Sequence, residues 1–310
     1  MSVATTLSRI TGFVRWAVQA AALGTGVVAN AYTLSNTLPN QVYELFMGGL
    51  LSSIFVPLLV DRLTHQGEED ADRLANALLT ALVPVLTVVV VLGIVFAEPL
   101  VDLASSWEGE GAEETAALAV LLFRVFALQI LFYGLGALAI GILNAHRHFF
   151  LPTFAPVLNN LVVIAAFGGY YYMNAVAGRP EAAIYVLAGG TTFGVFVMSA
   201  VLFPAVYRLG YRPRPQLGHP ALISALRLAG PMFLFVAATV GVQFAANFLA
   251  SGFNGVDRLW YAFIVFSLPY GIFVVAIATA LTPELSEKFS QSDTDGYRRT
   301  LSFGLRTMAF

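Results

Sequence analysis

The chain contains no cysteine among its 310 residues, and charged side chains make up only 11% of it. Without cysteine there is no disulfide, no thiolate metal site and no cysteine nucleophile. A soluble globular domain carries about 25% charged residues, so the scarcity of charge excludes an ordinary soluble fold. The net charge is −2, and no cluster of Lys and Arg contains interleaved aromatic residues, which argues against nucleic acid as a partner.

Motifs of known catalytic and metal sites are also missing. The sequence has no HExxH, GxxxxGK[ST] or GxSxG motif and no paired His or Cys spacing typical of a metal site. We therefore expect no catalytic residue, no metal, no cofactor and no enzymatic activity. The N-terminal segment lacks the pattern of a removable signal peptide, so we expect the first apolar segment to stay in the protein.

Long apolar runs are what the sequence does contain. Hydrophobic residues make up 58% of the chain, which predicts an all-α polytopic membrane protein. Windows of about 20 apolar residues predict spans near 10–28, 36–60, 75–103, 115–143, 151–173, 182–207, 221–250 and 258–283. A further apolar run begins near Leu301 and is too short to cross a bilayer. Within the sixth span Gly190 and Gly194 form a GxxxG pattern, typical of closely packed membrane helices.

The distribution of positive charge predicts the orientation. With the N-terminus inside, thirteen of the 16 Lys and Arg residues fall on the inner side and two on the outer side, while Arg124 lies within the fourth span. Cytoplasmic loops are enriched in positive charge, so we expect a cytoplasmic N-terminus. The loop 108–114 is then outside and the loop His146–His148 inside.

A basic, proline-rich segment, Arg208–Pro220, separates the sixth span from the seventh and is the best boundary between two helical bundles. A repeat supports two bundles, because the Leu38-Pro39 pair that opens the second span recurs as Leu268-Pro269, 230 residues later. Two like bundles around a midplane site are a transporter design. The predicted domains are a six-helix N-terminal lobe at 1–207, a cytoplasmic linker at 208–220 and the start of a C-terminal lobe, with two to three helices, at 221–310.

The second span carries unusual polar residues, among them Asn40 and Glu44. A carboxylate inside an apolar span costs about 2.5–3.5 kcal/mol, and such groups usually face a bundle interior or a watery cavity. We therefore expect this helix to line a central cavity. The alternative is that Glu44 lies at the interface and reaches the membrane surface.

Two arginines of the first span, Arg9 and Arg15, are six residues apart and so about 120° apart around a helix. They need not share one face. Either both anchor the helix at the inner membrane surface, or Arg15, about one and a half turns deeper, points into the bundle and offers a bidentate fork to a phosphate.

Four segments occur in an order that we can compare with a known family: SRITGFVR at Ser8–Arg15, LPN followed by GGLLSSIFVPLL at 38–59, GILNAHRHFFLPTFAPVLNNLVVI at Gly141–Ile164, and LPYGIFVVAIATALTPELS at Leu268–Ser286. They resemble the motifs SRxLGFxRD, PNLLRRLFAEGALSSAFVPVL, GILNSYxRFxxPAxAPxxxNxxxI and PLGVFGVALATxLLPxLS. These belong to the MurJ (MviN-type) lipid II flippases of the multidrug/oligosaccharidyl-lipid/polysaccharide exporter superfamily.

The resemblance implies fourteen helices in two six-helix lobes plus two more, with both termini inside, so we expect the chain to be the N-terminal part of a longer protein. It also implies flipping of lipid II, the lipid-linked precursor of peptidoglycan, across the bacterial cytoplasmic membrane by alternating access. Arg9 and Arg15 match two family arginines of the central cavity.

The match is thinner elsewhere. The family's acidic residue after the first span falls on Asn30, and the first arginine of its second-span motif falls on Tyr43, with Glu44 following. With Tyr43 in place of an arginine, the predicted cavity contains fewer positively charged side chains than the cavity that the family motifs imply. The candidate substrate-binding residues are Arg9, Arg15, Asn30, Asn40, Tyr43 and Glu44.

Two other functions fit the sequence. An exporter of small amphipathic cations would favour an acidic cavity, which Glu44 and the scarcity of arginines suit. A membrane scaffold for cell-wall assembly would transport nothing. The partners expected for a flippase are a lipid-linked oligosaccharide such as lipid II, membrane lipids, and a proton or monovalent cation whose gradient Glu44 helps to couple to transport.

Overall fold

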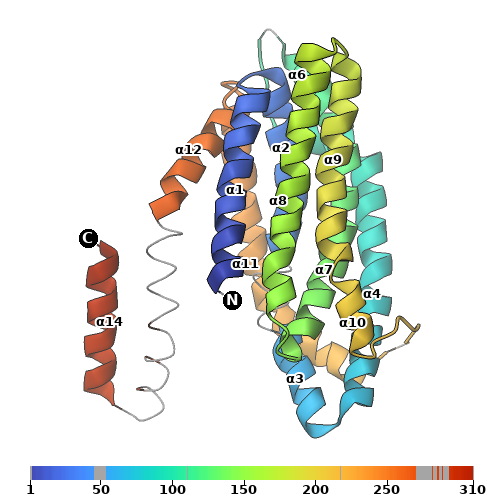
Figure 1. The fold of residues 1–310 in the computed structure, drawn as a ribbon, viewed down its shortest axis with the longest axis vertical. Coiled ribbons are helices and arrows are strands. Elements are labelled where there is room, and N and C mark those ends of the chain that lie inside the picture. Colours follow the sequence, from blue (N-terminus) through green and yellow to red (C-terminus); the bar gives the residue numbers. More distant parts are fainter. Residues whose placement is uncertain are drawn as a thin grey trace. The chain divides into compact units, whose positions relative to one another are not determined.

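The computed structural model describes residues 2–44, 54–109, 111–216, 218–269 and 293–309, together with Leu281, Leu285 and Lys288. Every regular element in these residues is a helix (Figure 1). By their internal contacts they form two compact units, Met1–Asp257 and Arg258–Phe310. Each unit is described by itself.

The first unit contains most of the helices. In chain order they are α1 (Ser2–Leu23), α2 (Val27–Glu44), α3 (Val56–His65), α4 (Glu68–Val95), α5 (Ala97–Ala104), α6 (Ala112–Phe126), α7 (Leu128–Ala145), α8 (Phe150–Tyr171), the π-helical turn η2 (Tyr172–Val176), α9 (Pro180–Ala200), α10 (Phe203–Arg208) and α11 (Pro220–Ser251). Helix α12 (Val256–Pro269) begins in this unit and continues into the second, which also contains α14 (Thr294–Ala309).

Four stretches of the described helices are long and apolar enough to cross a membrane: Glu68–Val95, Ala112–Ala145, Phe150–Val176 and Pro180–Arg208. They confirm the third to sixth predicted spans. On α4 the side chains of Val85, Val88 and Val95 are exposed, as expected of a helix that faces lipid tails rather than water. The chain is therefore a multi-pass, all-α membrane protein.

Several helix boundaries differ from the predicted ones. Helix α1 ends at Leu23 rather than near 28, because Gly24 and Gly26 take φ angles of 62° and 127°, which favour glycine. Helix α2 then begins at Val27 rather than near 36. Helix α4 begins at Glu68 rather than near 75, because its three acidic residues at 68–70 fit the first turn, where the helix dipole favours negative charge.

The predicted span 36–60 is described only in part. Helix α2 covers it up to Glu44 and α3 covers it from Val56, while residues 45–53 lie outside the described part. Most of the repeat at Leu268–Ser286 lies outside it as well. The apolar run predicted from Leu301 falls within α14, which starts earlier, at Thr294.

Helix α8 is central to the packing of the first unit. Helices α1 and α9 both pack along it, and α7 packs against α2, α4 and α9 (Figure 1). The turn between α1 and α2 lies at the opposite end of the unit from α3. A large apolar core lies near α3 and includes Leu59, Leu74, Leu143 and Leu202. It holds together the end of the unit at which α3, α4, α7 and α9 meet.

Glycine allows α8 and α9 to approach closely. A Cβ atom added to Gly190 would lie 2.4 Å from the Cβ of Ala166, and one added to Gly194 would lie 2.6 Å from Oδ1 of Asn159. Neither separation is compatible with van der Waals contact. The GxxxG pattern predicted for this helix is therefore a packing face.

The segment between α10 and α11, residues 209–219, is fixed to α4, and we call it the strap. The backbone N–H of Arg214 donates to Oδ1 of Asn76 at 2.8 Å, and that of Gln216 donates to Oγ1 of Thr80 at 3.0 Å. Two side chains one turn apart on α4 thus hold an irregular backbone in place. We call this end of the unit the strap end and the other, with the α1–α2 turn, the turn end.

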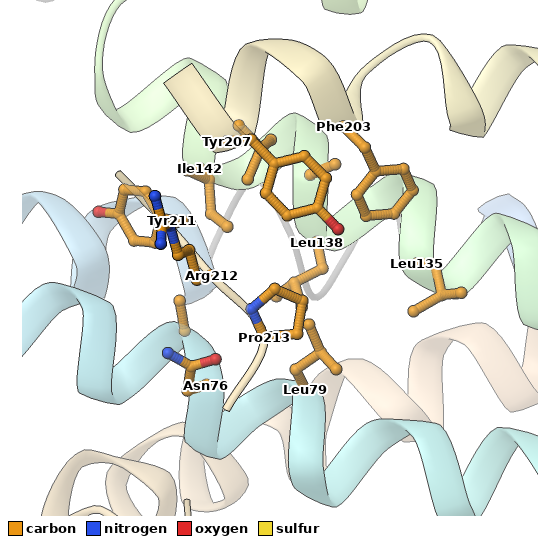
Figure 2. A pocket seen from close by; sticks show the side chains of 13 residues that line it. Asn76, Leu79, Leu135, Leu138, Ile142, Phe203, Tyr207, Tyr211, Arg212 and Pro213 are labelled. Atoms are coloured by element: carbon orange, nitrogen blue, oxygen red, sulfur yellow. The ribbon is translucent and has the colours of Figure 1, made fainter. Parts of the chain in front are cut away.

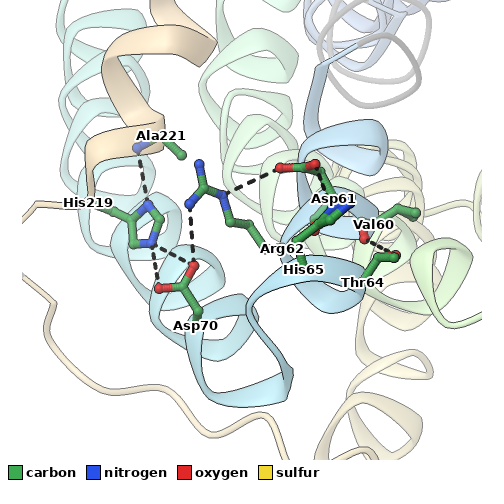
Figure 3. A network of polar contacts seen from close by, with 8 residues as sticks. All are labelled: Val60, Asp61, Arg62, Thr64, His65, Asp70, His219 and Ala221. Atoms are coloured by element: carbon green, nitrogen blue, oxygen red, sulfur yellow. Dashed lines mark hydrogen bonds and ion pairs between the residues drawn. The ribbon is translucent and has the colours of Figure 1, made fainter.

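His219 ends the strap and joins it to α11 (Figure 3). Its Nδ1 accepts the N–H of Ala221 at 3.2 Å, and its Nε2 lies 3.4 Å from the carboxylate of Asp70. Because Nδ1 accepts, the ring proton is on Nε2 and points toward the carboxylate. Arg62 of α3 lies 3.7 Å from the same carboxylate. One carboxylate therefore connects α3, α4 and the start of α11.

Replacing Gly190 with alanine should destabilise the protein. The new Cβ meets Ala166, which has no flexible side chain that could move away, and overpacking costs about 1–3 kcal/mol, more than the ~0.5–1 kcal/mol that alanine gains over glycine in a helix. Thermal unfolding in detergent measures the effect. Gly189→Ala is the matched control, since nothing lies within 4 Å of its added Cβ. Equal melting temperatures for the two variants would show that the α8–α9 contact is not tight.

Replacing His219 with alanine should loosen the strap. The variant loses the group that caps α11 and one contact of Asp70, and the loss of a helix cap costs about 0.5–2 kcal/mol. We expect faster proteolytic cleavage within residues 209–219 and partial recovery with His219→Asn, which can also cap. His65→Ala is the control, because that side chain is 70% exposed. Cleavage of His219→Ala at the rate of the unchanged protein would contradict this account.

Candidate functional site

One face of α2 carries a row of polar side chains. Tyr32, Asn36, Asn40 and Tyr43 follow one another at spacings of four, four and three residues, so they lie within about 80° around the helix. Asn40 and Tyr43 belong to the predicted binding residues. Tyr32 and Asn36 are additions from the structure. We call these four residues the α2 row.

Contacts with α7 and α9 hold the row in the bundle interior. The hydroxyl of Tyr133 on α7 donates to Oδ1 of Asn40 at 2.8 Å, and its ring centroid lies 4.6 Å from that of Tyr43. Nearer the turn end, the hydroxyl of Tyr32 lies 3.3 Å from Oγ1 of Thr191 on α9. Tyr32 and Tyr133 are 2% and 4% exposed. Polar groups therefore occur along the middle of the bundle.

Arg15 on α1 brings positive charge to this interior. Its Nε is buried and has no hydrogen-bond partner among the described residues, and its guanidinium carbon lies 5.4 Å from the ring centroid of Trp16. The hydroxyls of Tyr32 and Tyr133 both lie within range of its charge. The Arg15 side chain is half-buried, with its Nε inside the bundle.

Arg15 and Asn36 lie at similar distances along their helices from the α1–α2 turn. Arg15 precedes the end of α1 by eight residues, and Asn36 follows the start of α2 by nine. At 1.5 Å per residue the two are about 12 Å and about 13.5 Å from the α1–α2 turn. Oδ1 of Asn36 is buried, and its carboxamide makes no hydrogen bond to the described residues. Nε of Arg15, a donor on α1, and Oδ1 of Asn36, an acceptor on α2, therefore both lack a hydrogen-bond partner among the described residues.

Two glutamines add to this unpaired set. Nε2 of Gln19 on α1 and both polar side-chain atoms of Gln41 on α2 are buried without a partner in the described part of the chain. A buried polar group without a hydrogen bond costs about 1–3 kcal/mol. Several such groups in the interior of one bundle indicate a site that water or a polar ligand completes.

The other predicted residues lie apart from Arg15. Asn30 is near the turn end, where its Nδ2 donates to the carbonyls of Gly26 and Asn254 at 2.9 and 3.2 Å and its Oδ1 accepts the N–H of Asp257 at 3.2 Å. Its carboxamide thus joins the α1–α2 turn to the turn between α11 and α12. Ten residues, or about 15 Å along the helix, separate it from Asn40.

Arg9 and Glu44 are both exposed. Arg9 lies on a different face of α1 from Arg15, in line with their spacing of about 120°. Glu44 is the last described residue of α2, toward the strap end. The structure therefore brings together Arg15, Asn40 and Tyr43 of the six predicted residues, and leaves Arg9, Asn30 and Glu44 at other positions.

A small cavity lies under the strap, between α4, α7 and α10 (Figure 2). It has a volume of ≈ 30 Å³, room for one or two water molecules. Phe203 and Tyr207 of α10 cover it, and Leu79 and Leu138 are among the apolar residues that line it. A sugar or a diphosphate is too large for this space. None of the predicted binding residues lines it.

Tyr211 of the strap lies against the same cavity. Burial raises the pKa of its hydroxyl, and the nearby carboxylates of Asp72 and Glu68 raise it further. The phenol is therefore neutral at physiological pH and serves as a packing group, with its ring 5.4 Å from that of His146. Among the described residues no group of three or more His, Asp or Glu side chains could hold a metal ion.

Comparison with known proteins identifies the family. The family model described as lipid II flippase MurJ matches residues 19–310. The lipid II flippase MurJ of Burkholderia cenocepacia is 30% identical over 97% of this chain and 59% of its own length. The probable lipid II flippase MurJ of Vibrio cholerae is 29% identical over 100% of this chain and 60% of its own, and that of Rhizobium meliloti is 32% identical over 91% and 53%.

A solved structure shows the same fold. The structure titled lipid II flippase MurJ, inward closed conformation, superposes with a TM-score of 0.80 at 23% sequence identity and covers 99% of this chain and 62% of that one. The fold is therefore a transporter fold, and the chain spans about three-fifths of the length of the relatives it matches. Because the family model covers nearly all of the sequence, this chain belongs to the lipid II flippase MurJ family.

Proposed function

We propose that this chain takes part in flipping lipid II and that Arg15 binds the diphosphate of the lipid. The observation that carries the proposal is the guanidinium itself, whose Nε is buried in the bundle without a partner among the described residues. A cation inside a membrane protein is costly unless an anion meets it. A transported anion meets it during each cycle and leaves it afterwards. The names of the relatives support lipid II as the substrate.

The binding step needs no covalent chemistry. The arginine fork matches the oxygens of a phosphate, and each charge-assisted hydrogen bond contributes about 1.5–3 kcal/mol. Asn40, Tyr43 and the hydroxyl of Tyr133 supply neutral polar groups toward the strap end. A headgroup that leaves Arg15 thus passes polar side chains rather than apolar ones.

Transport by alternating access requires a second lobe. We also propose that residues 1–207 form a six-helix lobe, that residues 208–220 are a linker, and that residues 221–310 belong to a second lobe. The charge distribution supports an N-terminus on the cytoplasmic side of the bacterial cytoplasmic membrane. Glu44, exposed toward the strap end, is the residue through which a proton or monovalent cation gradient would be coupled to transport.

Replacing Arg15 with alanine should weaken the binding of a polyprenyl diphosphate by roughly 10- to 150-fold, the equivalent of one charge-assisted hydrogen bond. Native mass spectrometry of the purified 310-residue chain with added lipid measures it. Arg73→Ala is the control, since Arg73 is an exposed partner of Glu69, and it should bind as the unchanged protein does. An exporter of amphipathic cations would show the opposite result, tighter cation binding after loss of Arg15. Equal diphosphate binding by both variants would leave Arg15 without the proposed role.

The proposed orientation places the start of α6 outside and the α7–α8 turn inside. The chain has no cysteine of its own, so single cysteines at Glu113 and His148 report cleanly. Glu113 and His148 are both exposed. An impermeant thiol reagent added to intact cells should label the cysteine at 113 and not the one at 148. The reverse pattern would invert the topology.

A further inference from the structure

Asn36 is a polar residue that no sequence motif singled out and that the fold does not use. Its Oδ1 is buried, and its carboxamide makes no hydrogen bond within the described residues. Two buried asparagines of the unit do form such bonds: Asn160 donates to Oγ1 of Thr11 at 3.1 Å, and Asn76 accepts from the strap. Oδ1 of Asn159, like that of Asn36, has no partner among the described residues. Asn36 therefore stabilises nothing that the structure shows.

The neighbours of Asn36 in the α2 row relate it to the proposed phosphate site, because the Arg15 charge reaches the hydroxyl of Tyr32 and that of Tyr133, which donates to Asn40. Asn36 lies in the α2 row between Tyr32 and Asn40, at a distance from the α1–α2 turn similar to that of Arg15 on the preceding helix. A ligand that meets both residues must have an anionic group for the guanidinium and a neutral hydrogen-bonding group for the carboxamide. The two groups must be near each other in the ligand, since the Arg15 charge reaches the hydroxyl of Tyr32, one turn before Asn36 in the α2 row.

We propose that Asn36 is a specificity-determining residue that binds the sugar attached to the diphosphate of a lipid-linked saccharide, through a hydroxyl or an acetamido group. This inference rests on the proposed function, because Arg15 must hold the diphosphate for Asn36 to reach the sugar. A carboxamide both donates and accepts but carries no charge, which suits a hydroxyl or an amide and gives no advantage with a bare phosphate. Asn36 thus distinguishes a glycosylated lipid from the same lipid without its sugar.

The test compares two lipids on the full chain: a polyprenyl diphosphate, and the same lipid carrying one N-acetylated sugar. Asn36→Leu removes the carboxamide and keeps the volume close. We expect the variant to bind the sugar-bearing lipid about three- to tenfold more weakly, the equivalent of one neutral hydrogen bond. It should bind the bare diphosphate as the unchanged protein does, whereas Arg15→Ala should weaken the binding of both.

Stability supplies the second readout. Replacing an unpaired buried amide with an apolar group of similar shape is neutral or stabilising, so Asn36→Leu should melt no lower than the unchanged protein. Asn160→Leu is the control, since it breaks contacts between α8 and α1. It should melt lower and keep the preference for the sugar.

The outcomes separate this inference from the proposed function. If Asn36→Leu weakens both lipids equally, or neither, Asn36 does not read the sugar. The same conclusion follows if the unchanged protein binds the two lipids equally well, although the phosphate site would then still stand. If the unchanged protein binds neither lipid, the proposed function fails and the inference fails with it.

Discussion

One constraint governs the first unit: a half-buried guanidinium, Arg15, whose Nε lies in the bundle and forms no ion pair with the described residues. In water Arg15 would need no partner, but in a low-dielectric interior its charge must be compensated by hydrogen bonds or by a counterion. The described residues give its Nε no hydrogen bond. The buried hydroxyls of Tyr32 and Tyr133 lie within range of this charge, so its surroundings are not wholly apolar.

The rest of the first unit keeps that interior in place. Glycines let α8 and α9 approach closely, and α1, which carries Arg15, packs along α8. At the turn end the carboxylate of Asp257 accepts the N–H of Gly26, and Asn30 fixes the same turn. At the strap end Asp70 joins three segments. Both ends are thus held by polar contacts between elements, and the interior between them contains the buried Nε of Arg15 and Oδ1 of Asn36 without a hydrogen-bond partner among the described residues.

Much of this arrangement could be predicted from the sequence, and the reasons for the remainder are physical. The length of the apolar runs predicts the spans, because the thickness of the bilayer sets the length of a spanning helix. The spacing of Arg9 and Arg15 indicates that the two side chains need not share a face of their helix. Tyr133 could not be found in this way, since it lies 93 residues from Asn40 and only packing brings them together. Asn30 was expected at the binding site, but sequence alone could not show that its carboxamide contacts the turn between α11 and α12. The spacing of Tyr32, Asn36 and Asn40 was visible in the sequence and would have predicted the α2 row.

The most direct test is an experimental structure of the full chain with a bound lipid-linked diphosphate. We expect density for the diphosphate within hydrogen-bond distance of the Arg15 guanidinium, with Asn36 on the sugar side. Diphosphate density at the strap arginines instead, with the interior around Arg15 empty, would show that Arg15 does not bind the diphosphate.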